Sequence, residues 1–279
     1  MDYIELTINC VPRDPWAAIL VAQLSEIGFE SFVDTETGVM AYAPAALVNA
    51  ESPFKSTMFE NEMEQVSINY ELKRIPHQNW NRVWESEFSP VYVDGSLTIL
   101  APFHDRSQHS GMLIEIEPRM SFGTGHHQTT RIMCRAMLDL EKMPKRVLDV
   151  GTGTGVLAIL AEKLGAVEVL ATEIEEWSVE NANENVRRNQ CQCIEVVLGD
   201  IVKIPKKDFG LIIANINKNV LKAHLPEYAK RMSEGGRLLL SGFFLSDCDE
   251  LVSLAGNYGF QMVRILDMDN WAAIEFLIV

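Results

Sequence analysis

The chain has 279 residues, of which 24 are Lys or Arg and 39 are Asp or Glu, so its net charge is −15. Hydrophobic residues make up 47% of the sequence, which excludes global disorder, because disordered chains lack the apolar surface that offsets ordering entropy. No stretch reaches the roughly 18 consecutive apolar residues of a membrane-spanning helix, and the N-terminus does not resemble a secretory signal. Five scattered cysteines form no zinc motif, so we expect no metal site and a reduced, cytoplasmic protein.

The negative charge is concentrated in the first third of the chain. Residues 1–90 hold 14 acidic and 5 basic residues, a net of −9, whereas residues 91–279 hold 25 and 19, a net of −6. Such a charge disfavours nucleic acid as the main target, because phosphate binding needs a basic footprint. It is compatible with a basic protein partner, which the opposite field attracts.

Residues 1–75 are predicted to form a small ferredoxin-like α+β domain. Apolar residues alternate from Ile4 to Cys10, as in a half-buried strand. Asp14 then predicts the N-cap of a helix, which Gly28 closes. The order β-α-β-β-α-β is that of the split βαβ fold. The remaining strands are expected at 29–33, 39–42 and 66–72, and the second helix near 45–60.

Residues 76–95 are predicted to be a helical linker and residues 96–279 a second domain. From Arg146 strands and helices alternate, and the strands are almost continuously apolar, as in a parallel sheet covered on both faces. The last two strands are joined without a helix and must pair antiparallel. The expected fold is therefore α/β and Rossmann-like, a mostly parallel sheet that ends in an antiparallel hairpin. From residue 147 its strands are expected at 147–150, 167–172, 194–198, 209–215, 236–241, 260–266 and 271–279.

A glycine-rich loop joins the first of these strands to a helix. The sequence runs Val147-Leu148-Asp149-Val150-Gly151-Thr152-Gly153-Thr154-Gly155. Glycines permit a tight turn and let a ligand lie against bare backbone, and the helix that follows offers free N–H groups. In open α/β sheets ligands bind beyond the carboxyl ends of the strands, where this loop lies. Gly151, Gly153 and Gly155 are therefore predicted to bind a cofactor.

The loop alone leaves two classes of cofactor open. Gly153-x-Gly155-x-x-Ala158 also fits the dinucleotide fingerprint. Glu173 ends the next strand, where its carboxylate can accept hydrogen bonds from the ribose of either cofactor or simply be solvated. Asp149 inside the strand, the alternating glycines and the terminal hairpin together resemble the S-adenosylmethionine-dependent methyltransferase fold.

Polar residues also end the third and fourth strands. In such methyltransferases an acid in the place of Asp200 commonly meets the adenine amino group, although a plain N-cap is equally compatible. The amide of Asn215 can accept hydrogen bonds from a substrate amine and orient its lone pair toward the methyl group. Asn215 resembles the first residue of the asparagine motif of amino-directed methyltransferases, and a turn asparagine is the alternative.

The segment before the glycine loop, Met120–Thr130, is too specialised for an ordinary linker. Thr129 or Thr130 is expected to cap the following helix or to bind the charged amino-acid end of the cofactor. His126 and His127 do not predict a metal site, because the side chains of adjacent histidines rarely point at one ion.

These motifs together resemble the bacterial ribosomal protein L11 methyltransferase family. Its signature is similar to P-x-x-A-F-G-T-G-x-H-x-T-T, followed by V-L-D-x-G-x-G-x-G and later A-N-I. The matching positions are Pro118, 122–125, His127, Thr129 and Thr130, then 147–155 and 214–216. The departures are Ser121 for alanine, Gln128 for proline, Glu173 for aspartate and 217–219 for a more apolar stretch.

The resemblance implies a protein N-methyltransferase that uses S-adenosyl-L-methionine and methylates lysine side chains and the α-amino group of ribosomal protein L11. It implies cofactor contacts at Thr130, Gly151, Glu173 and Asn215, and we expect Asn215 to orient the amine without a general base. It also implies an N-terminal domain that grips the ribosomal protein. We expect a monomer that binds neither nucleic acid nor membrane. The alternatives are an NAD-dependent oxidoreductase and a non-catalytic ribosome-binding protein with a vestigial cofactor fold.

Overall fold

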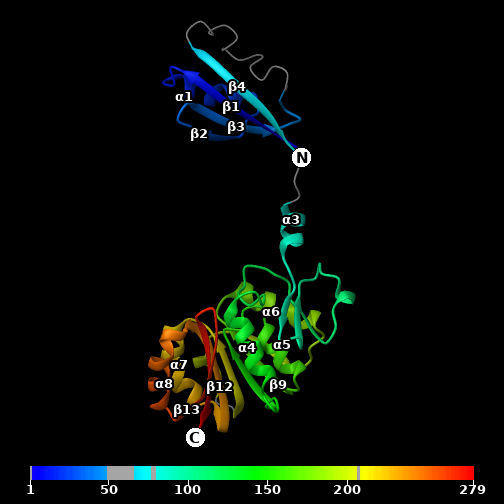
Figure 1. Ribbon diagram of the computed structural model, residues 1–279, viewed down its shortest axis with the longest axis vertical. Helices are drawn as coiled ribbons and strands as arrows, with labels where there is room; N and C mark the ends of the chain where they lie inside the picture. The colour runs from blue at the N-terminus through cyan, green and yellow to red at the C-terminus, as the bar shows by residue number, and fades with distance from the viewer. Residues whose placement is uncertain (1, 49–65, 77–79, 206–207) are drawn as a thin grey trace. The chain divides into compact units, whose positions relative to one another are not determined.

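The computed structural model describes residues 2–48, 66–76, 80–205 and 208–279. Contacts within the chain divide it into two compact units, of which the first ends at Phe88 and the second begins at Ser89. The first unit is an antiparallel sheet with a packed helix, and the second is a larger α/β unit (Figure 1).

The sheet of the first unit has the strand order β2-β3-β1-β4, and all of its pairings are antiparallel. Strand β1 thus lies between two strands that follow it later in the chain, as a split βαβ fold requires. Helix α1 (Trp16–Glu26) follows β1, as predicted. The predicted second helix falls mostly outside the described residues, so the ferredoxin-like assignment stays a prediction. The strands are β1 (Tyr3–Val11), β2 (Ser31–Asp34), β3 (Gly38–Pro44) and β4 (Ser67–Ile75).

The first unit has its own apolar core, to which β1 contributes alternate residues such as Leu6 and α1 contributes Leu20. The predicted cap of α1 is wrong. Pro15 holds the N-cap position, and no side chain caps the helix there. The Asp14 carboxylate instead accepts a hydrogen bond of 3.0 Å from the Arg13 guanidinium, because an adjacent cation competes for it.

Helix α3 (Trp80–Glu87) lies in the stretch that the sequence predicts as a helical linker. Its contacts place it in the first unit, whereas strand β5 (Val91–Val93) belongs to the second. The division into residues 1–75, 76–95 and 96–279 stays a prediction.

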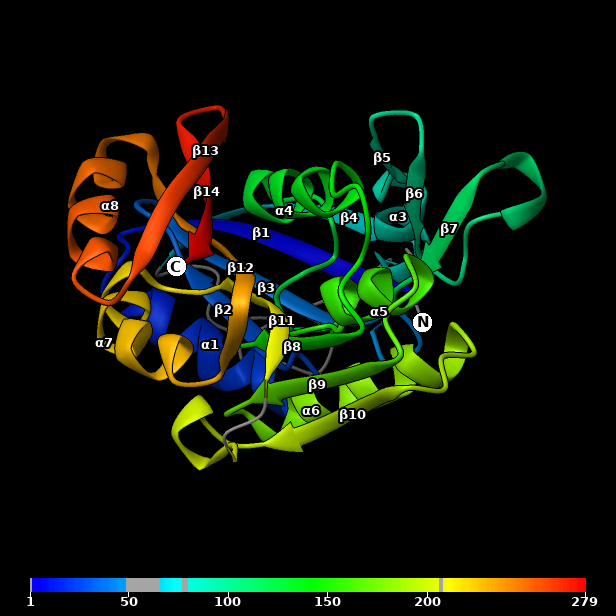
Figure 2. The ribbon, with the colours of Figure 1, turned by 90° about the horizontal axis from the view of Figure 1, so that it is seen from below.

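The second unit contains a seven-stranded sheet with the order β10-β9-β8-β11-β12-β14-β13. The first five of these strands pair in parallel, and β14 pairs antiparallel with both β12 and β13. Figure 2 shows the terminal hairpin beside α8. The predicted α/β sheet with an antiparallel hairpin is confirmed. The strands are β8 (Arg146–Val150), β9 (Glu168–Glu173), β10 (Ile194–Leu198), β11 (Phe209–Asn215), β12 (Met232–Phe244), β13 (Phe260–Met268) and β14 (Trp271–Ile278).

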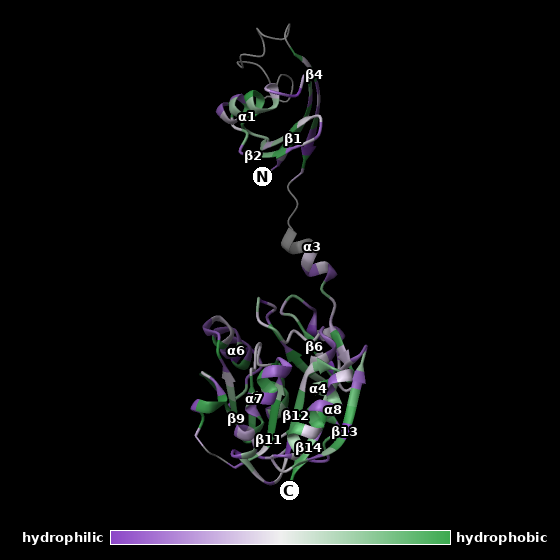
Figure 3. Ribbon diagram, turned by 90° about the vertical axis from the view of Figure 1, so that its left-hand side faces the viewer, coloured by the Kyte–Doolittle hydropathy of each residue, from purple (hydrophilic) through white to green (hydrophobic). Residues whose placement is uncertain are grey.

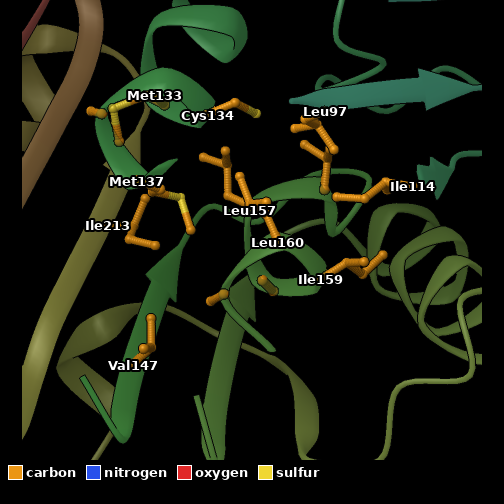
Figure 4. Close-up of a cluster of buried hydrophobic side chains, with 14 of the residues drawn as sticks. Leu97, Ile114, Met133, Cys134, Met137, Val147, Leu157, Ile159, Leu160 and Ile213 are labelled. Carbon is orange, nitrogen blue, oxygen red and sulfur yellow. The ribbon is translucent and has the colours of Figure 1, made fainter. Parts of the chain in front are cut away.

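Helices cover both faces of this sheet, as the apolar strands predict (Figure 3). Along β8, Val147 belongs to the core under α4 and α5, and Leu148 belongs to the core on the opposite face, with α7 and α8. Figure 4 shows side chains of α4 and α5, such as Met137 and Leu157, together with Ile213; Val147, lower on its strand in this view, belongs to the same core. The helices are α4 (Gln128–Leu138), α5 (Val156–Lys163), α6 (Glu176–Arg188), α7 (Lys218–Ala229) and α8 (Cys248–Gly256).

A separate three-stranded sheet, β5-β6-β7, precedes the large one and is fastened to α6 by amide side chains. The side chain of Asn189 accepts a hydrogen bond from the backbone N–H of Glu115 at 2.9 Å and donates one to its carbonyl at 2.7 Å. Asn185 accepts from the N–H of Glu117, just beyond β7. Strand β6 is Leu97–Leu100 and β7 is Met112–Glu115.

No helix in the described parts of the chain is long and apolar enough to cross a membrane. Among the same residues, no cluster of His, Cys, Asp and Glu has the geometry of a metal site.

Candidate active site

A cavity of about 700 Å³ opens at the carboxyl ends of the parallel strands. The strand order reverses between β8 and β11, because β9 and β10 follow on one side and β12 on the other. Such a switch point is where open α/β sheets bind their ligands. The volume is in the range of pockets that hold a cofactor-sized molecule, roughly 300–1,000 Å³.

The glycine loop forms one wall of this cavity, and its shape depends on having no side chains. Gly151 and Gly153 line the cavity with φ angles of +71° and +56°. A Cβ on Gly153 would lie 2.2 Å from the carbonyl oxygen of Phe122, and one on Gly151 would lie 2.3 Å from a methyl group of Ile216. Gly155 does not line the cavity. It precedes α5 and packs against Ala182 of α6.

The backbone N–H groups of the loop itself are paired inside the protein. Gly151 and Thr152 both donate to the carbonyl of Thr172, and Gly155 donates to that of Thr152. Gly153 donates to the Glu173 carboxylate and Thr154 to a carbonyl of the preceding segment. The loop therefore offers a ligand a close, bare surface rather than a set of donors.

Asp149 lies beneath the loop and fixes its conformation. Its side chain is buried, and its carboxylate accepts a hydrogen bond of 2.6 Å from the Thr152 hydroxyl. Burial raises the pKa of this carboxyl to about 7, although the bonds from Thr152 and the N–H of Ala158 lower it. Asp149 is thus a support of the loop and not a group that lines the cavity.

Glu173 stands at the tip of β9, where the sequence predicts a ribose-binding acid. One oxygen accepts a hydrogen bond of 3.0 Å from the N–H of Gly153, and the other accepts one of 2.8 Å from the N–H of Ile174. The carboxylate lines the cavity in a fixed orientation. This arrangement favours a ligand role over a solvated acid, whereas the neighbouring Glu175 and Glu176 are exposed.

The segment 120–127 folds over the glycine loop. The carbonyls of Phe122 and Gly123 accept hydrogen bonds of 2.9 and 2.7 Å from the N–H and hydroxyl of Thr154. Ser121 is buried against Ser178 of α6, with 3.1 Å between their hydroxyl oxygens. We name this side of the cavity the glycine-loop wall; Gly151, Gly153, Ser121 and Phe122 form its surface, and the rest of Gly151–Gly155 lies behind them.

The start of α4 corrects one expectation. Neither Thr129 nor Thr130 caps the helix; the imidazole of His127 does so by accepting the N–H of Thr129 at 3.2 Å. Thr129 lines the cavity, whereas Thr130 is fully buried and does not. Within the described residues the Thr130 hydroxyl has no hydrogen-bond partner. The ring of His127 also packs edge-on against Trp271, which lines the cavity as well.

The opposite wall consists of polar side chains at the tips of β10 and β11. Asn215 lines the cavity, and its amide oxygen is buried without a partner in the described part of the chain. Asp200 lines it too; it holds the N-cap position of the short 3-10 helix Ile201–Lys203, but its side chain makes no capping bond there. His224 of α7 completes this surface, and sequence reasoning missed it. We name the surface formed by Gly199, Asp200, Asn215–Asn217 and His224 the strand-tip wall.

A family model described as ribosomal protein L11 methyltransferase (PrmA) matches residues 21–277. The chain belongs to this family. Curated relatives of that name include a Phocaeicola vulgatus protein, 37% identical over 99% of both chains, and a Porphyromonas gingivalis protein, 39% identical over 92% of this chain and 89% of its own. A crystal structure of a ribosomal protein L11 methylase from Lactobacillus delbrueckii subsp. bulgaricus covers 68% of this chain and 98% of its own, with a TM-score of 0.63 and 27% identity.

Membership of the family confirms the predicted methyltransferase fold and S-adenosyl-L-methionine as the cofactor. The cavity fits this molecule. The bare glycine surface lets the cofactor approach closely. Glu173 presents a carboxylate that can bind ribose hydroxyls. The buried amide oxygen of Asn215 has no donor among the described residues and can accept a hydrogen bond from a ligand. The overlapping dinucleotide fingerprint is therefore a consequence of the shared strand-loop-helix geometry.

Proposed function

We propose that this chain transfers methyl groups from S-adenosyl-L-methionine to amino groups of ribosomal protein L11, at lysine side chains and the α-amino terminus. The family to which it belongs carries this substrate in its name. The observation that carries the proposal is the amide oxygen of Asn215 at the tip of β11, which is buried in the wall of the cavity and has no partner among the described residues. A buried acceptor without a donor is costly, and an incoming amine supplies the donor.

The residues that would hold the cofactor follow from the geometry. Glu173 is proposed to bind the ribose hydroxyls, and Gly151 and Gly153 to lie against the cofactor backbone. Asp200 is proposed to meet the adenine amino group. Thr130 and Gly155 lie behind the cavity wall, so we propose that they act by packing rather than by direct contact. This replaces the direct contacts that the sequence predicts for them.

When bound, S-adenosyl-L-methionine supplies a methyl group on a positively charged sulfur, which is already a good leaving group. The protein has mainly to align a neutral amine with that methyl group. Asn215 orients the amine by accepting its N–H. Phe122 and Trp271, which also line the cavity, favour the deprotonated amine by excluding water. We therefore propose no general base, in agreement with the sequence analysis.

The first unit is proposed to recognise the substrate. Residues 1–90 carry a net charge of −9, which suits a basic protein surface and disfavours nucleic acid. We further propose that the division at 1–75, 76–95 and 96–279 separates recognition, linker and catalysis, and that the enzyme acts as a cytoplasmic monomer.

The test is incubation of the chain with purified L11 and S-adenosyl-L-methionine, followed by mass spectrometry of L11. Mass increments of whole methyl groups on lysine or the N-terminus are expected, and unchanged L11 would support a non-catalytic ribosome-binding protein. Calorimetric titration with S-adenosylhomocysteine and with NADH tests the other alternative, an NAD-dependent oxidoreductase. Tight binding of NADH alone would indicate an oxidoreductase.

A further inference from the structure

A histidine that the proposed mechanism does not use lies in the strand-tip wall. His224 belongs to α7, is buried and lines the cavity. Its Nε2 atom lies 3.3 Å from Oδ1 of Asp200, which follows β10 and is 24 residues earlier in the chain (224 − 200). The two side chains therefore meet only because the fold brings α7 beside the short turn Ile201–Lys203 that follows Asp200.

The two oxygens of Asp200 differ in their surroundings. Oδ1 is buried and has no hydrogen-bond partner within the described residues, and Nε2 of His224 lies 3.3 Å from it as an ion-pair contact. The Asp200 side chain as a whole is nevertheless 42% exposed, and that exposure lies outside Oδ1. One oxygen is held against the wall, and the remainder of the carboxylate faces the cavity.

The neutral imidazole of His224 carries one N–H and one lone pair. Because Nε2 faces a carboxylate, this nitrogen carries the hydrogen, and Nδ1 is the acceptor. Nδ1 is buried and unpaired in the described part of the chain, as is the hydroxyl of Tyr228 one turn later. Within the described residues, the polar contact of the His224 ring is therefore the one with Asp200.

Asp200 lies next to the acid that is proposed to hold ribose. The N–H of Gly199 donates a hydrogen bond of 2.7 Å to the carbonyl of Glu173, which ties the tip of β10 to the tip of β9. A nucleoside whose ribose binds Glu173 brings its base to this corner. Within the described residues Asp200 makes no side-chain capping bond to the turn that follows it, so this turn does not take up its second oxygen.

We propose that His224 is a positioning residue for nucleobase recognition. Its Nε2–H holds Oδ1 of Asp200, so that the second oxygen faces the cavity as an acceptor for the exocyclic amino group of a 6-aminopurine. A 6-oxopurine presents an oxygen at the same place and is repelled by the carboxylate. This inference rests on the proposed function, because it takes a nucleoside cofactor as the ligand of the cavity.

The test compares calorimetric binding of S-adenosylhomocysteine with that of S-inosylhomocysteine, in which the amino group is replaced by an oxygen. The wild-type chain is expected to prefer the adenosyl compound by about 10- to 100-fold, the range for a hydrogen bond to a charged group. His224→Gln places an amide N–H near the position of Nε2 and is expected to keep most of this preference. His224→Asn is too short to reach Asp200, and its preference is expected to fall by about 5-fold or more.

Two further variants complete the design. Asp200→Asn offers a donor and an acceptor to either base, so its preference is expected to be close to 1. Tyr228→Phe removes the neighbouring hydroxyl, which contacts neither ligand, and is expected to keep the wild-type preference. If His224→Asn loses its cooperative thermal unfolding transition, His224→Leu repeats the comparison without a polar group.

The outcomes separate this inference from the proposed function. Absence of any binding of S-adenosylhomocysteine to the wild-type chain would overturn both. If wild type, His224→Gln and His224→Asn all showed the same strong preference for the adenosyl compound, the role of His224 would be overturned and the proposed function would stand. Equal binding of both compounds to the wild-type chain would overturn the recognition of the amino group by Asp200.

Discussion

In the glycine-loop wall every backbone N–H from Gly151 to Gly155 is paired inside the protein. In the strand-tip wall, by contrast, Asn215 and His224 each keep a buried polar atom that has no partner among the described residues. The first wall acts through shape, because Gly151 and Gly153 line the cavity without side chains. The second wall acts through chemistry, because its buried polar groups have no partner in the described part of the chain and can pair with a ligand. Changes in the first wall should therefore abolish binding, and changes in the second should alter selectivity and rate.

The largest effect is expected from Gly153→Ala. Its Cβ would lie 2.2 Å from the Phe122 carbonyl oxygen at a φ angle of +56°, so the two segments that form the wall must separate. Affinity for S-adenosylhomocysteine is expected to fall by about 1,000-fold, or ~4 kcal/mol, in calorimetric titration. Gly256→Ala is the control, because a Cβ there meets nothing within 4 Å. Near-normal affinity of Gly153→Ala would show that the loop is not shaped for the ligand.

Asp149→Asn probes the support beneath the same wall. The unfolded chain releases the proton of this carboxyl near pH 3.8, whereas the folded protein holds it to about pH 7. Wild-type stability should therefore fall, relative to the variant, as the pH rises from about 4 to 7, by up to about 4 kcal/mol in total. Thermal unfolding of both proteins across this pH range measures the difference in their stability. If that difference did not depend on pH, the raised pKa of Asp149 would be contradicted.

Asn215→Ala tests the strand-tip wall. If the amide oxygen orients the substrate amine, kcat for methyl transfer to L11 should fall by about 30- to 100-fold, because alignment is lost. Affinity for S-adenosylhomocysteine should change by less than about 3-fold, since binding depends mainly on the other wall. Asn219→Ala, at an exposed position of α7, is the matched control. If the affinity for S-adenosylhomocysteine fell by the same factor as kcat, the two walls would not have the different roles described above.

The smallest effect is expected from a change in salt concentration. Salt should weaken the recognition of the protein substrate and leave cofactor binding in the cavity nearly unchanged. Residues 1–90 carry most of the negative charge, so KM for L11 should rise by about 3- to 10-fold between low and high ionic strength. Affinity for S-adenosylhomocysteine should change by less than about 2-fold over the same range. A KM for L11 that does not depend on salt would show that the negative charge of residues 1–90 plays no part in the recognition of L11.

The sequence predicts the glycine-loop wall better than the strand-tip wall, for a physical reason. The loop is local: strand, glycines and helix are contiguous, and their types and approximate limits are correct. Contacts between distant segments were not predictable. The role of His224 depends on Asp200, and nothing in the pattern of α7 distinguishes it from an ordinary polar helix residue.

Helix ends show the same limit on a smaller scale. Hydroxyl and carboxyl residues predict caps, yet the N-cap of α1 has no side-chain bond, and α4 is capped by an imidazole. In both cases a neighbour decides the outcome, because Arg13 takes the Asp14 carboxylate, and His127 lies one residue before the helix. The threonines that matched the cap pattern are instead buried.

The amide contacts between α6 and β7 have a consequence for solubility. Strand β7 is an edge of its small sheet, and unpaired backbone groups on such an edge are templates for pairing with another chain. Both backbone groups of Glu115 are occupied by the Asn189 side chain, and the N–H of Glu117 by Asn185. Two asparagines thus take the place of a further strand and block this edge against pairing with another chain.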